Sequence, residues 1–514
     1  MKKSLKISLF IVGGLVLLFL IIKFGSEWYI SEKLTDKINQ DNKMFQVDVE
    51  DVEVDLFNQI VTFTSIKFQP VDSSSSSVEG NVDRIELGSF DITGFLFNGV
   101  IKTNQIDINA PELTYVARKA SKTKKQDSTS GGLFKQDIFD RIKVKKLTID
   151  NGNLKLAGTL KGSYKLDRFS LENIVVDSAS MAKKIPFNYD SALMRVDSIS
   201  YQPDSLYRLA SSQITYDAHQ LSIQDFQLIP LVDQSQYVET FAKRKPLYDI
   251  FTSSILIDSL YWEMPVGEKV SFTTAQLNLD SLNLALFIDK RVPANQQKVP
   301  MPSQSLQKLP FLMTINAINV NNSILNYSIR PEDNPEVAEL VFSDISIDGD
   351  HITNDSSLLA NQPSANFEIN AVFMKKSKFK GSFSFNMVKN DYPFTASGNL
   401  APFLMHQVNS LTRPLLSVEL NGSLNNLTYD FSGNSDTASG SVDLAYQDLK
   451  ITFQEKPNKS APILQALSEL VVNNNVKQAN NQVAKVDFDK DPTKGFFDYW
   501  WTGLESGIKK TLLP

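Results

Sequence analysis

The chain has 514 residues, of which 42% are hydrophobic and 21% charged, and its formal net charge is −6. Because this acidic balance is mild, it gives no electrostatic footprint for nucleic acid and argues against nucleic acid as a partner. The absence of cysteine excludes disulfides, thiolate metal sites and cysteine nucleophiles.

The N-terminal region contains a run of apolar residues long enough to cross a bilayer. Residues 7–22 carry no charge, and the run extends over residues 5–24 if the flanking lysines reach the two interfaces. Lysines precede the run, so the positive-inside rule predicts a cytoplasmic N-terminus and the rest of the chain across the membrane. We predict a single-pass anchor over residues 1–30; a cleaved signal peptide is the alternative. The residues expected at the membrane interface are Lys6, Lys23, Trp28 and Tyr29.

The body of the chain, residues 31–455, shows short runs in which apolar and polar residues alternate. Residues 276–279 (Gln-Leu-Asn-Leu) and 382–385 (Ser-Phe-Ser-Phe) are examples. A period of two residues is typical of half-buried strands, and the breaks are rich in Asn, Asp, Ser and Gly, which suit turns. The sequence therefore predicts a mainly β fold, as a meander of antiparallel strands.

One sequence unit recurs within this body. It has two apolar residues at alternate positions, four polar positions that open with Asn or Asp, and two more alternating apolar residues. Copies occupy residues 106–115, 147–156 and 318–327, and a weaker copy begins at Ile255. Each copy predicts a β-hairpin with a four-residue turn. The spacing is irregular, so a strict solenoid repeat is not expected.

Short helices are expected at residues 234–244 and 402–409, and a helical tail over residues 456–514. In the tail, residues 462–472 have helical spacing, and residues 496–508 place two tryptophans on one apolar stripe. Such a stripe can cap an open end of a sheet, which protects the edge from pairing with other chains. It can also lie in a membrane interface or bind a partner helix.

Recognised catalytic and metal-binding motifs are missing from the sequence. His219, His351 and His406 are isolated from one another, and there is no G-x-S-x-G elbow, H-E-x-x-H helix or EF-hand loop. We therefore expect no metal, no cofactor and no enzymatic activity. Two carboxylates that converge in three dimensions, as in a glycosidase, remain a third alternative.

Residues near the C-terminal end of the body resemble a known family. Within residues 380–453, the motifs are Gly398-Asn-Leu400, Gly422-x-Leu424, Ala438-Ser-Gly440-Ser-Val442-Asp443 and Tyr446-x-Asp448-Leu449-Lys450. This segment resembles the C-terminal portion of bacterial AsmA-like proteins. The N-terminal layout is similar too, with an anchor followed by residues 82–87 and 106–113.

The resemblance implies an elongated, curved antiparallel sheet, a taco-like repeating β-groove with an apolar concave face. It also implies a protein anchored in the bacterial inner membrane, with its bulk in the periplasm, that handles phospholipid and supports outer-membrane homeostasis. Its expected partners are membrane phospholipids and inner- or outer-membrane proteins. The residues expected to line the groove are Ile106, Ile108, Leu113, Tyr115, Leu147, Ile149, Leu154, Leu156, Ile318, Val320, Leu325 and Tyr327.

Elementary energetics are compatible with this expectation. A sheet with one apolar face needs a covering layer, and the sequence offers few helices to provide it. Acyl chains suit such a face, because each buried CH₂ contributes about 0.8 kcal/mol and needs no polar partner. The alternative from another class is an envelope assembly factor or scaffold that contacts outer-membrane proteins without lipid transport.

Overall fold

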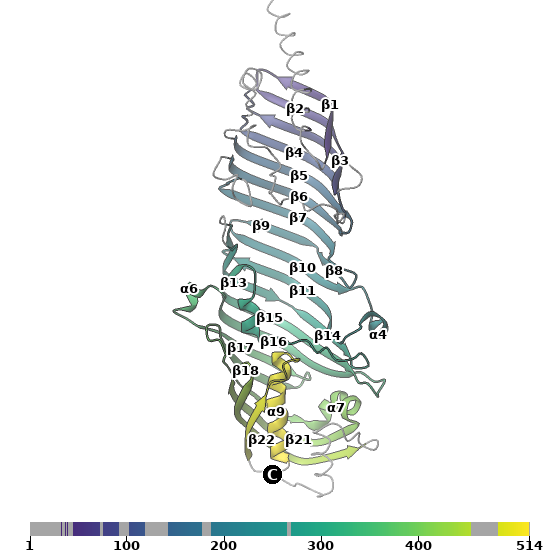
Figure 1. The fold of residues 1–514 in the computed structure, drawn as a ribbon, viewed down its shortest axis with the longest axis vertical. Helices are drawn as coiled ribbons and strands as arrows, with labels where there is room; N and C mark the ends of the chain where they lie inside the picture. The colour runs from purple at the N-terminus through teal and green to yellow at the C-terminus, as the bar shows by residue number, and fades with distance from the viewer. Residues whose placement is uncertain are drawn as a thin grey trace, which may run out of the picture. The chain divides into compact units, whose positions relative to one another are not determined.

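The computed structural model describes residues 45–71, 76–91, 102–118, 142–176, 187–264, 269–453 and 482–512, together with Glu32, Asp36 and Asn39. The anchor, its four interface residues and residues 462–472 lie outside the described residues. The fold is mainly β, with a few short helices, as the alternation predicts (Figure 1). In the part of the chain that is described, no helix is both long and apolar enough to cross a membrane.

The chain divides into two compact units. The first comprises Met1–Asp204, Leu209–Ala218 and Met264–Glu268, and the second comprises Ser205–Arg208, His219–Glu263 and Lys269–Pro514. The first unit contains β1 (Gln46–Asp55), β2 (Ile60–Gln69), β3 (Ser77–Gly88), β4 (Gln105–Ala117), β5 (Ile142–Gly158), β6 (Lys161–Val176), β7 (Ser191–Gln202) and β9 (Gln213–Asp217), while β8 (Tyr207–Ser211) has residues in both units.

The second unit holds the remaining strands and the helices from α4 onward. Its strands are β10 (Gln220–Pro230), β11 (Leu247–Asp258), β12 (Tyr261–Glu263), β13 (Ser271–Asp280), β14 (Asn283–Asp289), β15 (Leu312–Arg330), β16 (Ala338–Thr353), β17 (Ser364–Phe373), β18 (Ser377–Asn386), β19 (Phe394–Leu400), β20 (Phe403–Leu404), β21 (Val418–Gly433), β22 (Thr437–Phe453) and β23 (Gln482–Asp489). Its helices are α4 (Tyr237–Thr240), α5 (Pro302–Gln307), α6 (Ser356–Leu359), the 3₁₀ turn η1 (Met405–Val408), α7 (Asn409–Leu416) and α9 (Phe496–Leu512).

The pairing of the strands corrects the prediction of a purely antiparallel meander. In the first unit β1 to β7 pair in sequence order, and in the second unit the order is β10, β11, β13 with β14, β15 to β19, β21, β22 and β23. Most pairs are antiparallel, but β4 and β5 are parallel, and β13 and β14 both pair with β15 in parallel. Parallel neighbours cannot be joined by a tight hairpin.

The recurring sequence unit is therefore not a hairpin, and that prediction was wrong. Each of the three full copies lies within one continuous strand, and its four polar positions contain a residue with left-handed backbone. These residues are Ala110 in β4 (φ 48°), Asn151 in β5 (φ 57°) and Asn322 in β15 (φ 52°). Such a residue interrupts the pleat without ending the strand, and we call it a bulge. The register to β16 shifts beside Asn322, whereas the register across Ala110 and Asn151 continues in step. The weaker copy at Ile255 extends across the break between β11 and β12.

Two copies of the unit lie side by side as the parallel pair β4 and β5. Ile108 is opposite Ile149, and Leu113 is opposite Leu154. The third copy pairs in the same way with the end of β13 and the start of β14, so Asn321 is opposite Asp280. A side-chain hydrogen bond recurs across the bulges, because Asn151 Nδ2 donates to Asn109 Oδ1 at 3.4 Å and Asn322 Nδ2 donates to Asp280 Oδ1 at 2.9 Å.

The bulges determine which face each half of a strand presents. Phe63 and Ile66 of β2 are three positions apart and would point to opposite faces of a regular strand. Both nevertheless belong to one buried cluster, with Ser65 (φ 53°) between them in left-handed conformation. The left-handed residue thus keeps the apolar side chains of both halves on one side of the sheet, while the register to β1 and β3 continues unchanged.

Two helical predictions need correction. Residues 402–409 form β20 and η1, and the helix α7 begins only at Asn409. The Asn409 side chain joins this helix to β21, since its Oδ1 accepts from Leu420 N at 2.9 Å and its Nδ2 donates to Leu420 O at 3.1 Å. The tail is not only helical, because residues 482–489 form β23 beside β22.

Candidate functional site

The most extended chemical feature of the described residues is the apolar face of the sheet. Cα partners in neighbouring strands have side chains on the same face, so the strand register defines rows that run from strand to strand. In the first unit one row is apolar across every strand from β1 to β7. Its members are Val54, Val61, Leu87, Ile106, Leu147, Leu171 and Ala192.

Two further rows in the first unit are almost as continuous. One continues into β9 and consists of Val52, Phe63, Ile85, Ile108, Ile149, Phe169, Met194 and Tyr216. The other lies beyond the bulges and consists of Val47, Phe68, Gly80, Leu113, Leu154, Tyr164 and Ile199. All the groove candidates predicted in this unit lie in these rows or, for Tyr115 and Leu156, one step beyond them.

The second unit carries the same kind of rows. One consists of Leu221, Ile257, Leu277, Ile318, Gly349, Phe367, Phe383, Ala396, Phe431, Gly440 and Val486. Beyond the bulges, a shorter row consists of Leu228, Ile250, Leu284, Leu325, Phe342 and Phe373, followed by Tyr248, Leu286, Tyr327 and Leu340. The predicted candidates Ile318, Leu325 and Tyr327 are members, and Val320 lies in the row next to Ile318.

The exposure of the predicted candidates differs along the rows. Val320 is buried, Leu154 is 38% exposed, and the other ten are half-buried. Ile106 and Ile108 pack against the buried cluster of β1 to β3, and Ile106 and Leu147 pack against a second small cluster around Val144. The face is thus apolar but only partly covered by the described residues.

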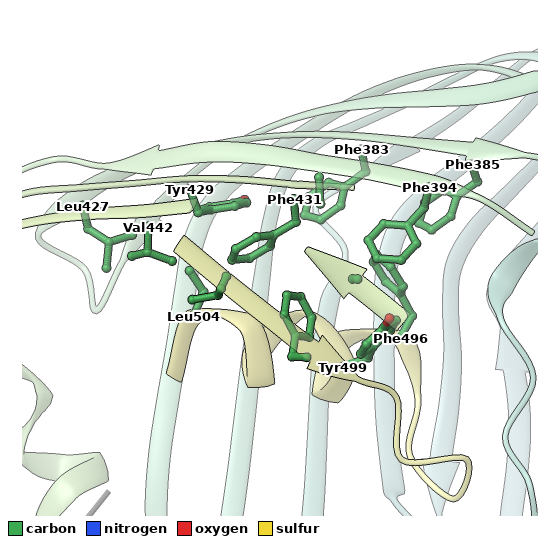
Figure 2. Close-up of a cluster of buried hydrophobic side chains, with 14 of the residues drawn as sticks. Phe383, Phe385, Phe394, Leu427, Tyr429, Phe431, Val442, Phe496, Tyr499 and Leu504 are labelled. Carbon is green, nitrogen blue, oxygen red and sulfur yellow. The ribbon is translucent and has the colours of Figure 1, made fainter. Parts of the chain in front are cut away.

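Helix α9 covers the far end of the same rows in the second unit. Over β18 to β21 the row residues Phe383, Ala396 and Phe431 are at most 5% exposed, and Val442 in β22 is fully buried as well. Figure 2 shows the side chains of Phe383, Phe431 and Val442 directed at the helix. The Phe496 ring lies 4.8 Å from the Phe385 ring. The tail stripe thus packs on the sheet, while its protection of an open edge stays a prediction.

The close approach of α9 depends on two glycines one turn apart. A Cβ on Gly507 would lie 2.3 Å from Val442 Cγ2, and a Cβ on Gly503 would lie 2.5 Å from Phe488 Cζ. This contact was not predicted from the sequence. The four-residue spacing of small residues on a helix was the pattern that indicated close packing.

The outer side of α9 is also apolar in part. Phe497 is 69% exposed and Trp501 is 46% exposed, one turn apart on the helix. Neither residue belongs to the packed stripe, which consists of Phe496, Tyr499, Trp500, Leu504 and Ile508. The helix therefore covers the sheet and still presents two aromatic rings to solvent.

The described residues contain titratable groups that catalysis could use. No three of their His, Asp and Glu side chains are grouped so that they could hold a metal ion. A hollow of about 800 Å³ on the polar face near β18 to β23 includes Asp391, Asp487 and Asp489 in its lining. All three are exposed, whereas a carboxyl that acts as general acid is normally buried enough to raise its pKa.

Comparison with known proteins adds no assignment to this geometry. No family model matches the sequence, and no curated protein matches it.

Proposed function

We propose that the chain handles phospholipid by holding acyl chains against the apolar face of its sheet. The observation that carries this proposal is the continuity of the rows, whose apolar side chains follow one another across strands. Most of them are half-buried over β4 to β7 and β10 to β15. A stable sheet normally buries such a face against another layer. Acyl chains supply that layer without unpaired polar atoms.

The cellular setting of the proposal comes from the sequence. The apolar N-terminal run and the AsmA-like motifs support a protein anchored in the bacterial inner membrane by residues 1–30, with its bulk in the periplasm. There the face would form the groove along which phospholipid moves in support of the outer membrane. No reacting group is needed for this function.

Mass spectrometry of the gently purified full chain tests the proposal. The expected result is co-purified phospholipid in stoichiometric amount. Glutamate at Leu154 or Leu325 places a charge among the acyl chains, so we expect Leu154→Glu and Leu325→Glu to retain at least tenfold less lipid. The matched controls are Asn153→Glu and Asn326→Glu, which add the same charge at neighbouring positions on the other face.

A folded chain that is free of lipid would refute the proposal. So would equal lipid retention by the Leu154→Glu, Leu325→Glu and control variants, because the bound lipid would then lie elsewhere.

A second candidate function is an envelope assembly factor or scaffold. The exposed Phe497 and Trp501 favour it, because aromatic residues are enriched where proteins contact one another. Photo-crosslinking from these two positions in cells should then capture envelope proteins, while lipid stays absent from the purified chain.

A further inference from the structure

Lys290 stands at the end of an apolar row in the second unit. It follows Leu284, Leu286 and Ile288 at alternate positions, so its side chain lies on the apolar face of the sheet. The residue is half-buried, and its backbone N–H donates to Arg330 O at 2.8 Å. Throughout the described ranges, no hydrogen bond or ion pair involves its Nζ.

Arg244 brings a second positive charge to the same corner. Its Nη2 donates to Lys290 O at 2.7 Å and its Nε donates to Val292 O at 3.1 Å. Both acceptors are neutral backbone carbonyls, and within the described part of the chain no carboxylate pairs with this guanidinium. The contacts fix the position of the guanidinium and leave its charge uncompensated.

Positive charge predominates around Lys290. Burial lowers the pKa of Lys290, and the positive charges of Arg244 and Lys494 lower it further. The one carboxylate that acts in the opposite sense is Asp498, which is exposed on α9. A half-buried ammonium beside two other cations is costly unless an anion accompanies it.

The neighbouring surface suits a long apolar ligand. Leu286 is the Cα partner of both Tyr248 and Tyr327, and all three are half-buried. The charges of Arg244 and Asp498 both act on the Tyr327 hydroxyl, so this tyrosine lies at the boundary between the charged corner and the apolar rows.

We propose that Lys290 and Arg244 form a binding site for the phosphate of a lipid headgroup whose acyl chains lie on the adjoining apolar rows. The inference rests on the proposed function and adds the charge of the ligand. Phosphate oxygens accept charge-assisted hydrogen bonds from both ammonium and guanidinium groups, so an anionic phospholipid is the class of lipid that fits.

Binding of fluorescent lipids to the full chain in mild detergent tests the inference. The probes are phosphatidylglycerol and diacylglycerol with identical acyl chains, and inorganic phosphate is the competitor. We expect the wild type to bind phosphatidylglycerol about tenfold more tightly than diacylglycerol. Lys290→Gln should remove this preference and leave diacylglycerol binding unchanged, while Lys380→Gln on the polar face should change neither.

Asp498→Asn should change the binding of phosphatidylglycerol in the opposite direction to Lys290→Gln. Removal of this carboxylate should strengthen binding of phosphatidylglycerol by about threefold to tenfold and leave diacylglycerol unaffected. A purely structural role of the corner predicts no gain from this variant, because the exposed Asp498 side chain has no hydrogen bond or ion pair within the described residues.

The outcomes separate the two proposals. Equal binding of both lipids, unchanged in Lys290→Gln, would overturn the headgroup site and leave the lipid-handling function standing. Absence of binding by either lipid would refute the function itself. Inorganic phosphate that displaces phosphatidylglycerol at equal concentration would identify free phosphate as the ligand and overturn the assignment to a lipid.

Discussion

At the scale of single residues, the missing side chain of Gly507 allows α9 to approach the sheet closely. A Cβ at this position would lie 2.3 Å from Cγ2 and 2.4 Å from Cβ of Val442, which is fully buried in β22. Neither group is the end of a flexible side chain, so the helix would have to move away. The side chains of Phe496, Tyr499 and Leu504 would then lose part of their packing against the sheet.

We predict that Gly507→Ala lowers the free energy of unfolding by about 1–3 kcal/mol, the usual cost of overpacking. In a helix, alanine is more favourable than glycine by about 1 kcal/mol. A net loss of stability therefore means that the steric cost at Val442 exceeds this gain. Urea unfolding followed by tryptophan fluorescence reports on it, because Trp500 and Trp501 lie in α9. Thr502→Ala on the exposed side is the control; a loss as large there would contradict the packing argument.

Tyr327 should make stability depend on pH in the alkaline range. Burial raises the pKa of Tyr327 from 10.0 to about 12, with the negative charge of Asp498 as the second cause. Between these values the unfolded chain has released the proton while the folded chain retains it. The contribution of Tyr327 to stability is therefore complete below pH 10 and falls by up to about 2.7 kcal/mol as the pH rises toward 12.

We predict that the Tyr327→Phe variant loses less stability than the wild type between pH 9 and pH 11.5. Urea unfolding at a series of pH values measures the difference, and the other buried tyrosines cancel because both proteins contain them. Tyr261→Phe serves as the control, since Tyr261 is 52% exposed. Parallel curves for the Tyr327→Phe variant and the wild type would contradict the buried environment.

At the scale of elements, the strand bulges are where the sequence was hardest to interpret. Alternating apolar residues correctly predicted strands such as β13 and β18, because burial of one face imposes a period of two residues. The run Asn109-Ala-Pro-Glu112 has turn residues as well, and a local pattern cannot distinguish a turn from a bulge. The distinction is made by the neighbouring strands, which continue past Ala110 on both sides.

At the bulge of Ala110, glycine should stabilise the strand, whereas elsewhere in a strand it destabilises. Alanine pays a steric cost at φ 48°, whereas glycine does not. We predict that Ala110→Gly raises the free energy of unfolding by about 0.5–1 kcal/mol, as measured by denaturant titration. Ala157→Gly, in a regular part of β5, should lower it by a similar amount, and the same sign for both variants would contradict the bulge.

Only part of the candidate site could be predicted from the sequence, because the pairing of strands is not local information. The sequence identified the apolar positions of the rows, since alternation is local information. It did not identify the parallel pairing, because the pairing depends on which strands meet and not on the strand sequence. It also did not single out Lys290 or Arg244, which lie far apart in the chain and meet only through the hydrogen bond from Arg244 to Lys290 O.

At the scale of the whole molecule, the two units share one construction. Each contains parallel strands with aligned bulges, an asparagine hydrogen bond across those bulges and rows of apolar side chains on one face. They differ in how the rows are covered, because in the second unit α9 buries the part over β18 to β22. In both units the described residues leave other parts of the rows half-buried, so both should gain stability from a bound apolar ligand.

This gain gives the last prediction, which concerns the full chain. A ligand that binds only the folded state stabilises it by RT ln(1 + [L]/Kd), or about 2.7 kcal/mol at a hundredfold excess over Kd. For units of this size that corresponds to a rise in Tm of about 5–10 °C. Lipid-stripped protein should therefore melt at a lower temperature than protein reloaded with phospholipid, as measured by calorimetry.

Glycerol 3-phosphate lacks acyl chains and should not reproduce the rise in Tm. Leu154→Glu combined with Leu325→Glu should reduce the rise. An unchanged Tm at saturating phospholipid would mean that the apolar rows do not hold acyl chains.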